Sequence, residues 1–296
     1  MFNDYREKQF QIYSKARKAF IDNPSRLIEL EKYFSNYLFE LLESNKSSIG
    51  EDYNEASYLF PFWQNYPPDK RGRKPRGDQY PWIEVGEHAI GDKLPRLIAH
   101  DYAIRDVGLP TGPDKRLIIK GDVIFELTSI SDSAWLFVDI KSVGPRDDFE
   151  HAVMSHNQIS GSGDWKKQST GIKNAVMRAT GKRVKHPFHS SIPPIYILSD
   201  GTIAPVVNIA LKPVYKMLSL DERGADGGQP LERIEVIAIP NGILLDVNPG
   251  YLKKFPGLFF PGKDDKTKNP LKVRSRVDFA ILREIDEWRV RTVLFE

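Results

Sequence analysis

Residues 135–143 read WLFVDIKSV, and this apolar, β-branched run is typical of a strand buried in a sheet. Side chains alternate between the two faces of a strand, so Asp139 and Lys141 leave the same face, whereas Leu136, Val138 and Ile140 point to the other. Charge near a core is unfavourable unless it is paired or bound to a metal. This pair of side chains is therefore a candidate site.

Further strand patterns lie on both sides of this segment. LIIKGDVIFEL (117–127) is a β-branched and aromatic run, and IPPIYILSDGTIAPVVNIAL (192–211) holds two such runs joined at Asp200-Gly201, a hairpin signature. IEVIAIPNGILLDV (234–247) repeats that pattern around Asn241-Gly242. These runs predict an α/β fold with a mixed central sheet flanked by helices.

The first 45 or so residues have the apolar spacing of a helix with one buried stripe, and Pro24 is expected to split it in two. A stretch rich in proline and glycine (60–81) indicates a loop or arm. A short helix is expected over PWIEVGEHAI (81–90), where Pro81 suits a first turn.

Composition excludes several classes of protein. The chain of 296 residues is 40% hydrophobic and 28% charged, which is typical of a packed globular fold. It has 0 cysteines, so no disulfide, thiol nucleophile or cysteine-ligated metal is possible. No apolar run approaches the ~20 residues that cross a bilayer, and no secretion signal is visible. We expect a protein of a reducing cytoplasm with no membrane partner.

The formal charge of +3 is too small to indicate a polyanionic partner, but the basic residues are clustered. Three segments, 69–78, 160–190 and 263–276, hold most of the local excess of lysine and arginine. They could form one surface that faces phosphates, or be three solvated loops.

A second carboxylate is expected beside the strand pair. Asp114 lies just before the neighbouring strand, and two antiparallel strands joined by a turn near 128–134 would bring it toward Asp139. These two carboxylates and the carbonyl of Ile140 are the oxygen ligands that Mg²⁺ accepts, with room for water and a phosphate. Lys141 would orient the attacking water or stabilise the transition state. From spacing alone, a half-buried Asp139–Lys141 ion pair with Asp114 in a turn remains the alternative.

A series of motifs then gives the chain a recognisable family. Taken in order over nearly the whole length, the chain strongly resembles the BglI-type restriction endonucleases, on the segments DYNEA (52–56), PFWQNYPP (61–68), GDQYPWIEVGE (77–87), GLPTGPD (108–114), FVDIKSVGPRD (137–147), ISGSGDW (159–165), IPPIYILSDGTIAPVV (192–207), PGKDDKTK (261–268) and VRSRVD (273–278). The resemblance implies a type II restriction endonuclease with the PD-(D/E)XK nuclease core. It also implies a Mg²⁺-dependent homodimer that cuts double-stranded DNA at GCCNNNNNGGC with 3′ overhangs, and a cognate DNA methyltransferase that does not bind it stably.

The family motif is carried over residue by residue. Pro113-Asp114 matches the PD element, and Asp139-Ile140-Lys141 matches the DXK element. With this resemblance, a nuclease active site is favoured over a purely structural ion pair between Asp139 and Lys141. Related nucleases can also use a helix carboxylate beside the metal, for which Glu87 is preferred over Glu84, with a surface or capping role as the alternative.

The resemblance also implies the residues that read DNA bases. A reader of G·C pairs needs basic side chains for guanine and acidic ones for cytosine. The resemblance places base contacts at Lys263, Asp265, Arg274 and Arg276, and at Asp147 beside the active site. A solvated hairpin with internal ion pairs is the alternative for 261–278.

We expect one restriction endonuclease domain over 1–296, with a helical part at about 1–60, the catalytic sheet at about 80–215 and DNA-recognition hairpins and loops at about 230–280. The glycine-rich HNQISGSGDW (156–165) lacks the Gly-Lys-Ser/Thr ending of a nucleotide-binding loop and is expected to be a loop near the DNA. Two rival functions stay open: a repair or mobile-element nuclease on the same core, and a DNA-binding protein without catalysis.

Overall fold

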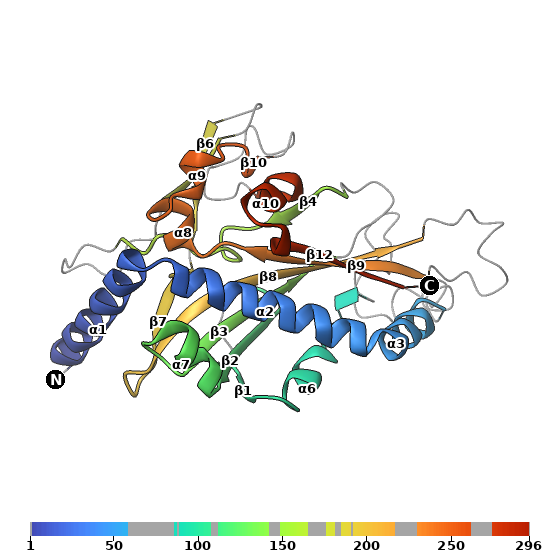
Figure 1. Cartoon of the computed structure of the whole chain (residues 1–296), viewed down its shortest axis with the longest axis horizontal. Helices are drawn as coiled ribbons and strands as arrows, with labels where there is room; N and C mark the ends of the chain where they lie inside the picture. Colours follow the sequence, from blue (N-terminus) through green and yellow to red (C-terminus); the bar gives the residue numbers. More distant parts are fainter. Residues whose placement is uncertain are drawn as a thin grey trace, which may run out of the picture.

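The computed structural model describes residues 2–58, 86–87, 89–107, 112–141, 149–164, 176–180, 185–190, 192–216, 230–261 and 274–295. Within these ranges the main sheet has the strand order β1-β2-β3-β8-β9-β12, with β7 also paired to β8 (Figure 1). Its strands are β1 (Ala103–Asp106), β2 (Lys115–Lys120), β3 (Ser133–Ile140), β7 (Ile195–Ile197), β8 (Ile203–Tyr215), β9 (Leu231–Ile239) and β12 (Val290–Leu294).

The main sheet is mixed, as predicted. β3 runs parallel to β8, whereas the other neighbouring pairs are antiparallel. The hairpin expected at Asp200-Gly201 is present, because β7 and β8 pair on either side of it. All eight residues of β3 are buried, which matches the expectation of a strand inside the sheet.

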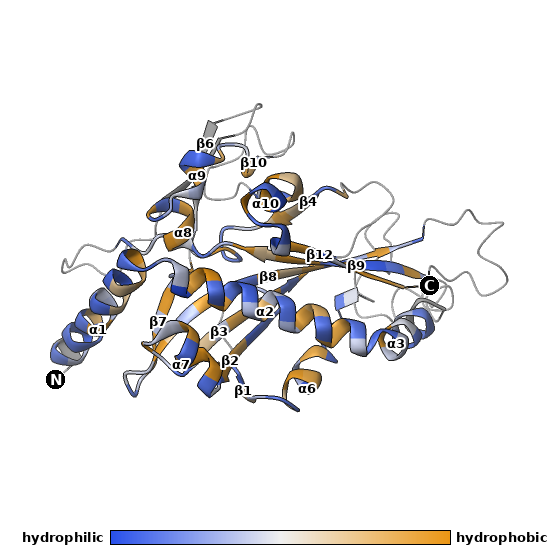
Figure 2. Cartoon of the chain, in the orientation of Figure 1, coloured by the Kyte–Doolittle hydropathy of each residue, from blue (hydrophilic) through white to orange (hydrophobic). Residues whose placement is uncertain are grey.

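The N-terminal helices divide between the two faces of this sheet, because the buried residues of the first helix belong to the core on the other face. The expected break at Pro24 separates α1 (Phe2–Asp22) from α2 (Ser25–Ser44), and α3 (Lys46–Tyr58) follows. The apolar stripe of α2 packs on the sheet in one core together with two short helices, α6 (Leu94–Ile98) and α7 (Asp122–Thr128). Figure 2 shows α2 with apolar and polar faces. Each fully buried leucine or phenylalanine of such a stripe contributes about 1.5–3 kcal/mol.

The other face supports a smaller sheet with the order β10-β11-β4. Its strands are β4 (His151–Met154), β10 (Phe259–Pro261) and β11 (Ser275–Asp278). This sheet shares a core with α8 (Gly242–Asp246), α9 (Tyr251–Lys254) and α10 (Phe279–Ile285), and the 3-10 turn η4 (Glu287–Arg289) precedes β12. A separate hairpin joins β5 (Val176–Thr180) to β6 (Lys185–His189).

Two strand predictions were wrong. The second half of the 117–127 run is α7 instead of a strand, so β2 and β3 are connected through a helix and not by a simple turn. A short apolar run cannot be assigned to strand or helix by periodicity alone. Asn241-Gly242 begins α8 instead of a hairpin: the Asn241 side chain caps that helix by accepting from the Ile243 amide at 3.0 Å.

A close backbone approach explains the glycine at this corner. A Cβ built on Gly242 would lie 2.0 Å from the carbonyl carbon and oxygen of Gly161. The start of α8 therefore packs directly on the main chain of the 159–163 segment, which only glycine permits.

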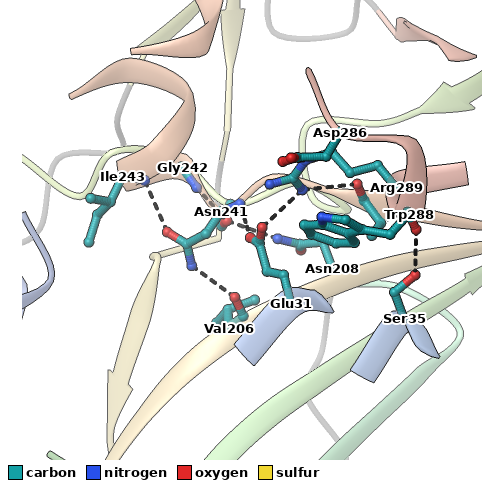
Figure 3. Close-up of polar contacts among 12 residues, drawn as sticks. Glu31, Ser35, Val206, Asn208, Asn241, Gly242, Ile243, Asp286, Trp288 and Arg289 are labelled. Carbon is teal, nitrogen blue, oxygen red and sulfur yellow. Dashed lines mark hydrogen bonds and ion pairs between the residues drawn. The ribbon is translucent and has the colours of Figure 1, made fainter. Parts of the chain in front are cut away.

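A buried ion pair joins the N-terminal helices to the C-terminal turn. Arg289 donates to Glu31 Oε2 at 3.0 Å, and the Asn241 amide donates to the other carboxylate oxygen of Glu31 (Figure 3). Both charged side chains are excluded from solvent. Burial raises the pKa of Glu31, and the charge of Arg289 opposes that shift.

None of the described helices is both long and apolar enough to cross a membrane.

Candidate active site

The end of β3 places a carboxylate and an ammonium side by side. Asp139 is buried on β3 opposite Ala210 of β8. The Lys141 amide donates to Leu211 O at 2.7 Å, which extends the β3–β8 ladder by one residue. Lys141 therefore leaves the same face as Asp139, and its Nζ forms an ion pair with Asp139 Oδ2. The side chain of Asp139 is 1% exposed and that of Lys141 is 24% exposed, so the lysine lies on the solvent side of the pair.

Asp114 lies beside this pair, as predicted. The antiparallel register aligns Lys115 of β2 with Val138 of β3, which brings the preceding Asp114 next to Asp139. Asp114 Oδ2 accepts a hydrogen bond of 2.7 Å from the Ile140 amide. This bond fixes the carboxylate against the main chain of the DXK segment.

Glu87 approaches from a short helical segment. The Gly91 amide donates to Glu87 O at 3.1 Å, which is the hydrogen bond of an α-helical turn. A Cβ on Gly91 would lie 2.6 Å from Ile140 Cδ1, so this turn packs on the end of β3. The negative charge of Glu87 acts on Asp139. Glu84, the alternative candidate, lies outside the described residues.

The electrostatics of the site favour a bound cation. Burial raises the pKa of Asp139 to about 7; Lys141 opposes the shift, while the negative charges of Asp114 and Glu87 add to it. The described groups thus hold more negative charge than one lysine neutralises. A cation placed here would restore the balance.

The donor set fits a hard divalent ion. Asp114, Asp139 and the carbonyl of Ile140 supply only oxygen ligands, which suits Mg²⁺ and leaves positions for water and phosphate. In the described part of the chain, no group of three or more acidic or histidine side chains is close enough to hold a metal by itself. The main-chain carbonyl is therefore needed in the proposed ligand set.

One contact was not anticipated from the sequence. Gln158 Nε2 donates to Asp139 Oδ1 at 2.5 Å, although the two residues are 19 positions apart. The segment 156–165 was expected only to be a loop near the DNA. No spacing rule could indicate this glutamine. Its contact depends on how the turn after β4, a strand of the smaller sheet, packs against β3 of the main sheet.

Of the candidate base-reading residues, the structure describes Arg274 and Arg276. Arg276 lies on β11, paired with Val153 of β4, and is partly buried. Arg274 is exposed and directly precedes β11, and Ser275 between the two arginines is buried. The two arginines therefore leave the same face of this strand, as predicted. Asp147, Lys263 and Asp265 lie outside the described residues.

A mixed sheet with two carboxylates and a lysine at the end of one strand defines the class of protein as a nuclease of the PD-(D/E)XK fold, in line with the resemblance. Comparisons with known proteins give the same result. The family described as Restriction endonuclease BglI matches residues 8–293. The chain is 48% identical to the type II restriction enzyme BglI of Bacillus subtilis, over 99% of both chains.

Solved structures agree with this comparison. The crystal structure of restriction endonuclease BglI bound to its DNA recognition sequence matches with a TM-score of 0.88 and 47% identity, over 99% of each chain. The tetrameric restriction endonuclease SfiI bound to cognate DNA shares the fold, with a TM-score of 0.61 and 14% identity over 91% of this chain and 85% of that one. The chain belongs to the BglI family and is a type II restriction endonuclease.

Proposed function

We propose that this restriction endonuclease cuts double-stranded DNA at GCCNNNNNGGC, uses Mg²⁺ and leaves 3′ overhangs. The observation that carries the chemistry is the convergence of Asp114, Asp139 and Lys141 at the end of β3. The expected recognition sequence rests on the resemblance to the BglI type, and the identity of 48% over the full chain supports it.

The geometry supports the following catalytic roles. Asp114 and Asp139, with the carbonyl of Ile140, would hold Mg²⁺, which supplies positive charge against the scissile phosphate and makes water easier to deprotonate. Lys141 Nζ lies on the solvent side of Asp139, where it orients the attacking water or stabilises negative charge on the pentacovalent transition state. Glu87 would add a further carboxylate, whose negative charge acts on Asp139.

Base recognition is proposed for five acidic and basic residues. Arginine and lysine suit the O6 and N7 acceptors of guanine, and aspartate accepts from the N4 amino group of cytosine. These roles are assigned to Asp147, Lys263, Asp265, Arg274 and Arg276.

A palindromic target matches a protein with two-fold symmetry, so the working form is a homodimer on double-stranded DNA. A cognate methyltransferase would protect host DNA in the prokaryotic cytoplasm without forming a stable complex with the nuclease.

The direct test is a digest of bacteriophage DNA with the purified protein and Mg²⁺, followed by sequencing of the fragment ends. Ends at GCCNNNNNGGC with 3′ overhangs are expected. Ends at another discrete site would keep the nuclease and reject the base assignments, whereas cuts without a palindromic site would favour a repair or mobile-element nuclease.

The variant Asp139→Asn distinguishes the nuclease from a DNA-binding protein without catalysis. We expect this variant to fold and to bind the cut site in Ca²⁺ without cleaving it in Mg²⁺. A wild-type protein that binds DNA tightly and never cuts it would support the non-catalytic alternative.

A further inference from the structure

We propose that Gln158 is a positioning residue that fixes the carboxylate of Asp139 for metal binding. This inference rests on the metal site proposed above and assigns a role to a residue outside the PD and DXK motifs.

The contacts of Asp139 define its orientation. Gln158 Nε2 donates to Oδ1 at 2.5 Å, while Lys141 pairs with Oδ2. Oδ1 thus has one fixed donor, and Oδ2 has an ion-pair partner but no hydrogen bond, so both oxygens retain lone pairs for another partner. A carboxylate held at both oxygens cannot rotate, so its free lone pairs point in constant directions. That is the property a metal site needs from its ligands.

The amide of Gln158 is itself oriented by the chain. Its Oε1 accepts from the Ser155 amide at 2.8 Å, and its own main-chain amide donates to Ser155 O at 3.0 Å. With the oxygen committed to Ser155, the NH₂ group must face Asp139. The turn that carries Gln158 follows β4 directly, so the strand paired with β11 leads into the site.

Buried hydrogen bonds hold the next part of this segment. Ser160 Oγ accepts from Asn208 Nδ2 at 2.9 Å and from the Gly242 amide at 3.0 Å. The Gly161 amide donates to Ile192 O at 2.9 Å. Anchors on β8, on α8 and ahead of β7 therefore fix the loop two residues after Gln158. The donor to Asp139 is preorganised and not part of a freely moving loop.

The expected effect of removing this donor is a loss of metal affinity. Partners that orient metal ligands typically contribute 10- to 100-fold in metal affinity or activity. For Gln158→Leu we expect the half-saturating metal concentration to rise by about that factor. Gln158→His keeps a ring N–H near the position of the amide nitrogen and should restore part of the loss. Gln11→Leu is the matched control, because Gln11 lies exposed on α1 and donates only to Glu7.

The experiment uses a DNA duplex that carries the sequence at which the wild-type enzyme cuts. The first readout involves no turnover: the Ca²⁺ concentration that gives half-maximal duplex binding, followed by fluorescence anisotropy. The second is the Mg²⁺ concentration that gives the half-maximal single-turnover cleavage rate. Both concentrations should rise for Gln158→Leu, rise less for Gln158→His and stay constant for Gln11→Leu.

The outcomes are distinct. Half-saturating Ca²⁺ and Mg²⁺ unchanged in Gln158→Leu, or a lower cleavage rate at every Mg²⁺ concentration with no shift in metal requirement, would overturn the role. If the leucine variant does not fold, Gln158→Asn replaces it, since that amide is one methylene too short to reach Asp139. A wild-type protein that cuts no DNA overturns the proposed function and this inference with it, whereas a cutting wild type with unshifted variants overturns the inference alone.

Discussion

Among single residues, Asp139 lowers the stability of the metal-free fold, because its carboxylate is buried. Its pKa is raised to about 7, above the ordinary value for an aspartate, chiefly because the side chain is buried. The stability that the protonated form contributes is complete below pH ~4 and is lost as the pH rises through 7. Without metal, the protein should therefore be less stable at pH 8 than the same fold with a neutral side chain at this position.

Asp139→Asn tests this directly. We expect its melting temperature in EDTA at pH 8 to exceed that of the wild type by a few degrees, and the difference to shrink toward pH 5. Lys141 is partly exposed and can be hydrated when its partner becomes neutral. Asp22→Asn, a surface change of the same type, should shift the melting temperature little. A variant less stable than the wild type at pH 8 would indicate that the ion pair is structural.

Specificity and affinity should separate at two other residues. Asp265→Ala should relax or abolish base recognition, because a carboxylate in a basic segment is expected to read cytosine. Lys182 belongs to the basic segment 160–190, so Lys182→Ala should reduce binding to all sequences and lower its salt dependence, as loss of a phosphate contact does. Competition between cut-site and random duplexes over a range of salt measures both effects. Equal losses of specificity in the two variants would contradict the assignment.

Among helices and strands, the sequence predicted correctly the features that depend on a few neighbouring residues. Pro24 ends α1 and Asp200-Gly201 turns β7 into β8, because both depend on backbone geometry within a few residues. The alternation that placed Asp139 and Lys141 on one face is equally local. The contact of Gln158 with Asp139 could not be read from the sequence, since tertiary packing creates it.

The role of Gly242 could not be predicted from the sequence either, because this glycine is needed for close packing on the Gly161 main chain and not for a turn. Its neighbour Gly161 leaves no room for a Cβ, so Gly242→Ala must displace α8 or the 159–163 segment. We expect a loss of at least ~2 kcal/mol in unfolding free energy by urea denaturation. Gly50→Ala is the control: it lies within α3, where its Cβ would meet only the Phe295 side chain at 3.3 Å, and alanine favours helix. A neutral Gly242→Ala would show that the two segments can separate freely.

In the molecule as a whole, an N-terminal helix and a C-terminal turn are joined by one buried ion pair. Glu31 and Arg289 are 258 positions apart, yet they join α2 to the turn before β12 (Figure 3). Arg289 also lies over the Trp288 ring at 4.3 Å. The main-chain amide of Asn241 donates to Glu31, and the Asn241 side chain caps α8. The ion pair is therefore linked to the start of α8, which packs on the segment after Gln158. The stability of the catalytic end of the sheet thus depends on contacts between distant parts of the sequence.

Removing one partner should cost more than removing both. Arg289→Met leaves Glu31 buried without its cation, which typically costs about 3–5 kcal/mol. Glu31→Leu with Arg289→Met leaves no buried charge, and Asp286, the other partner of Arg289, is partly exposed and can be hydrated, so the double variant should regain much of that loss. Urea unfolding of both single variants and the double variant gives the coupling energy. Because α2 and η4 pack on the same sheet, unfolding followed by fluorescence and by circular dichroism should shift together in all of them. Losses that simply add would instead mean that Glu31 and Arg289 stabilise separate parts of the fold.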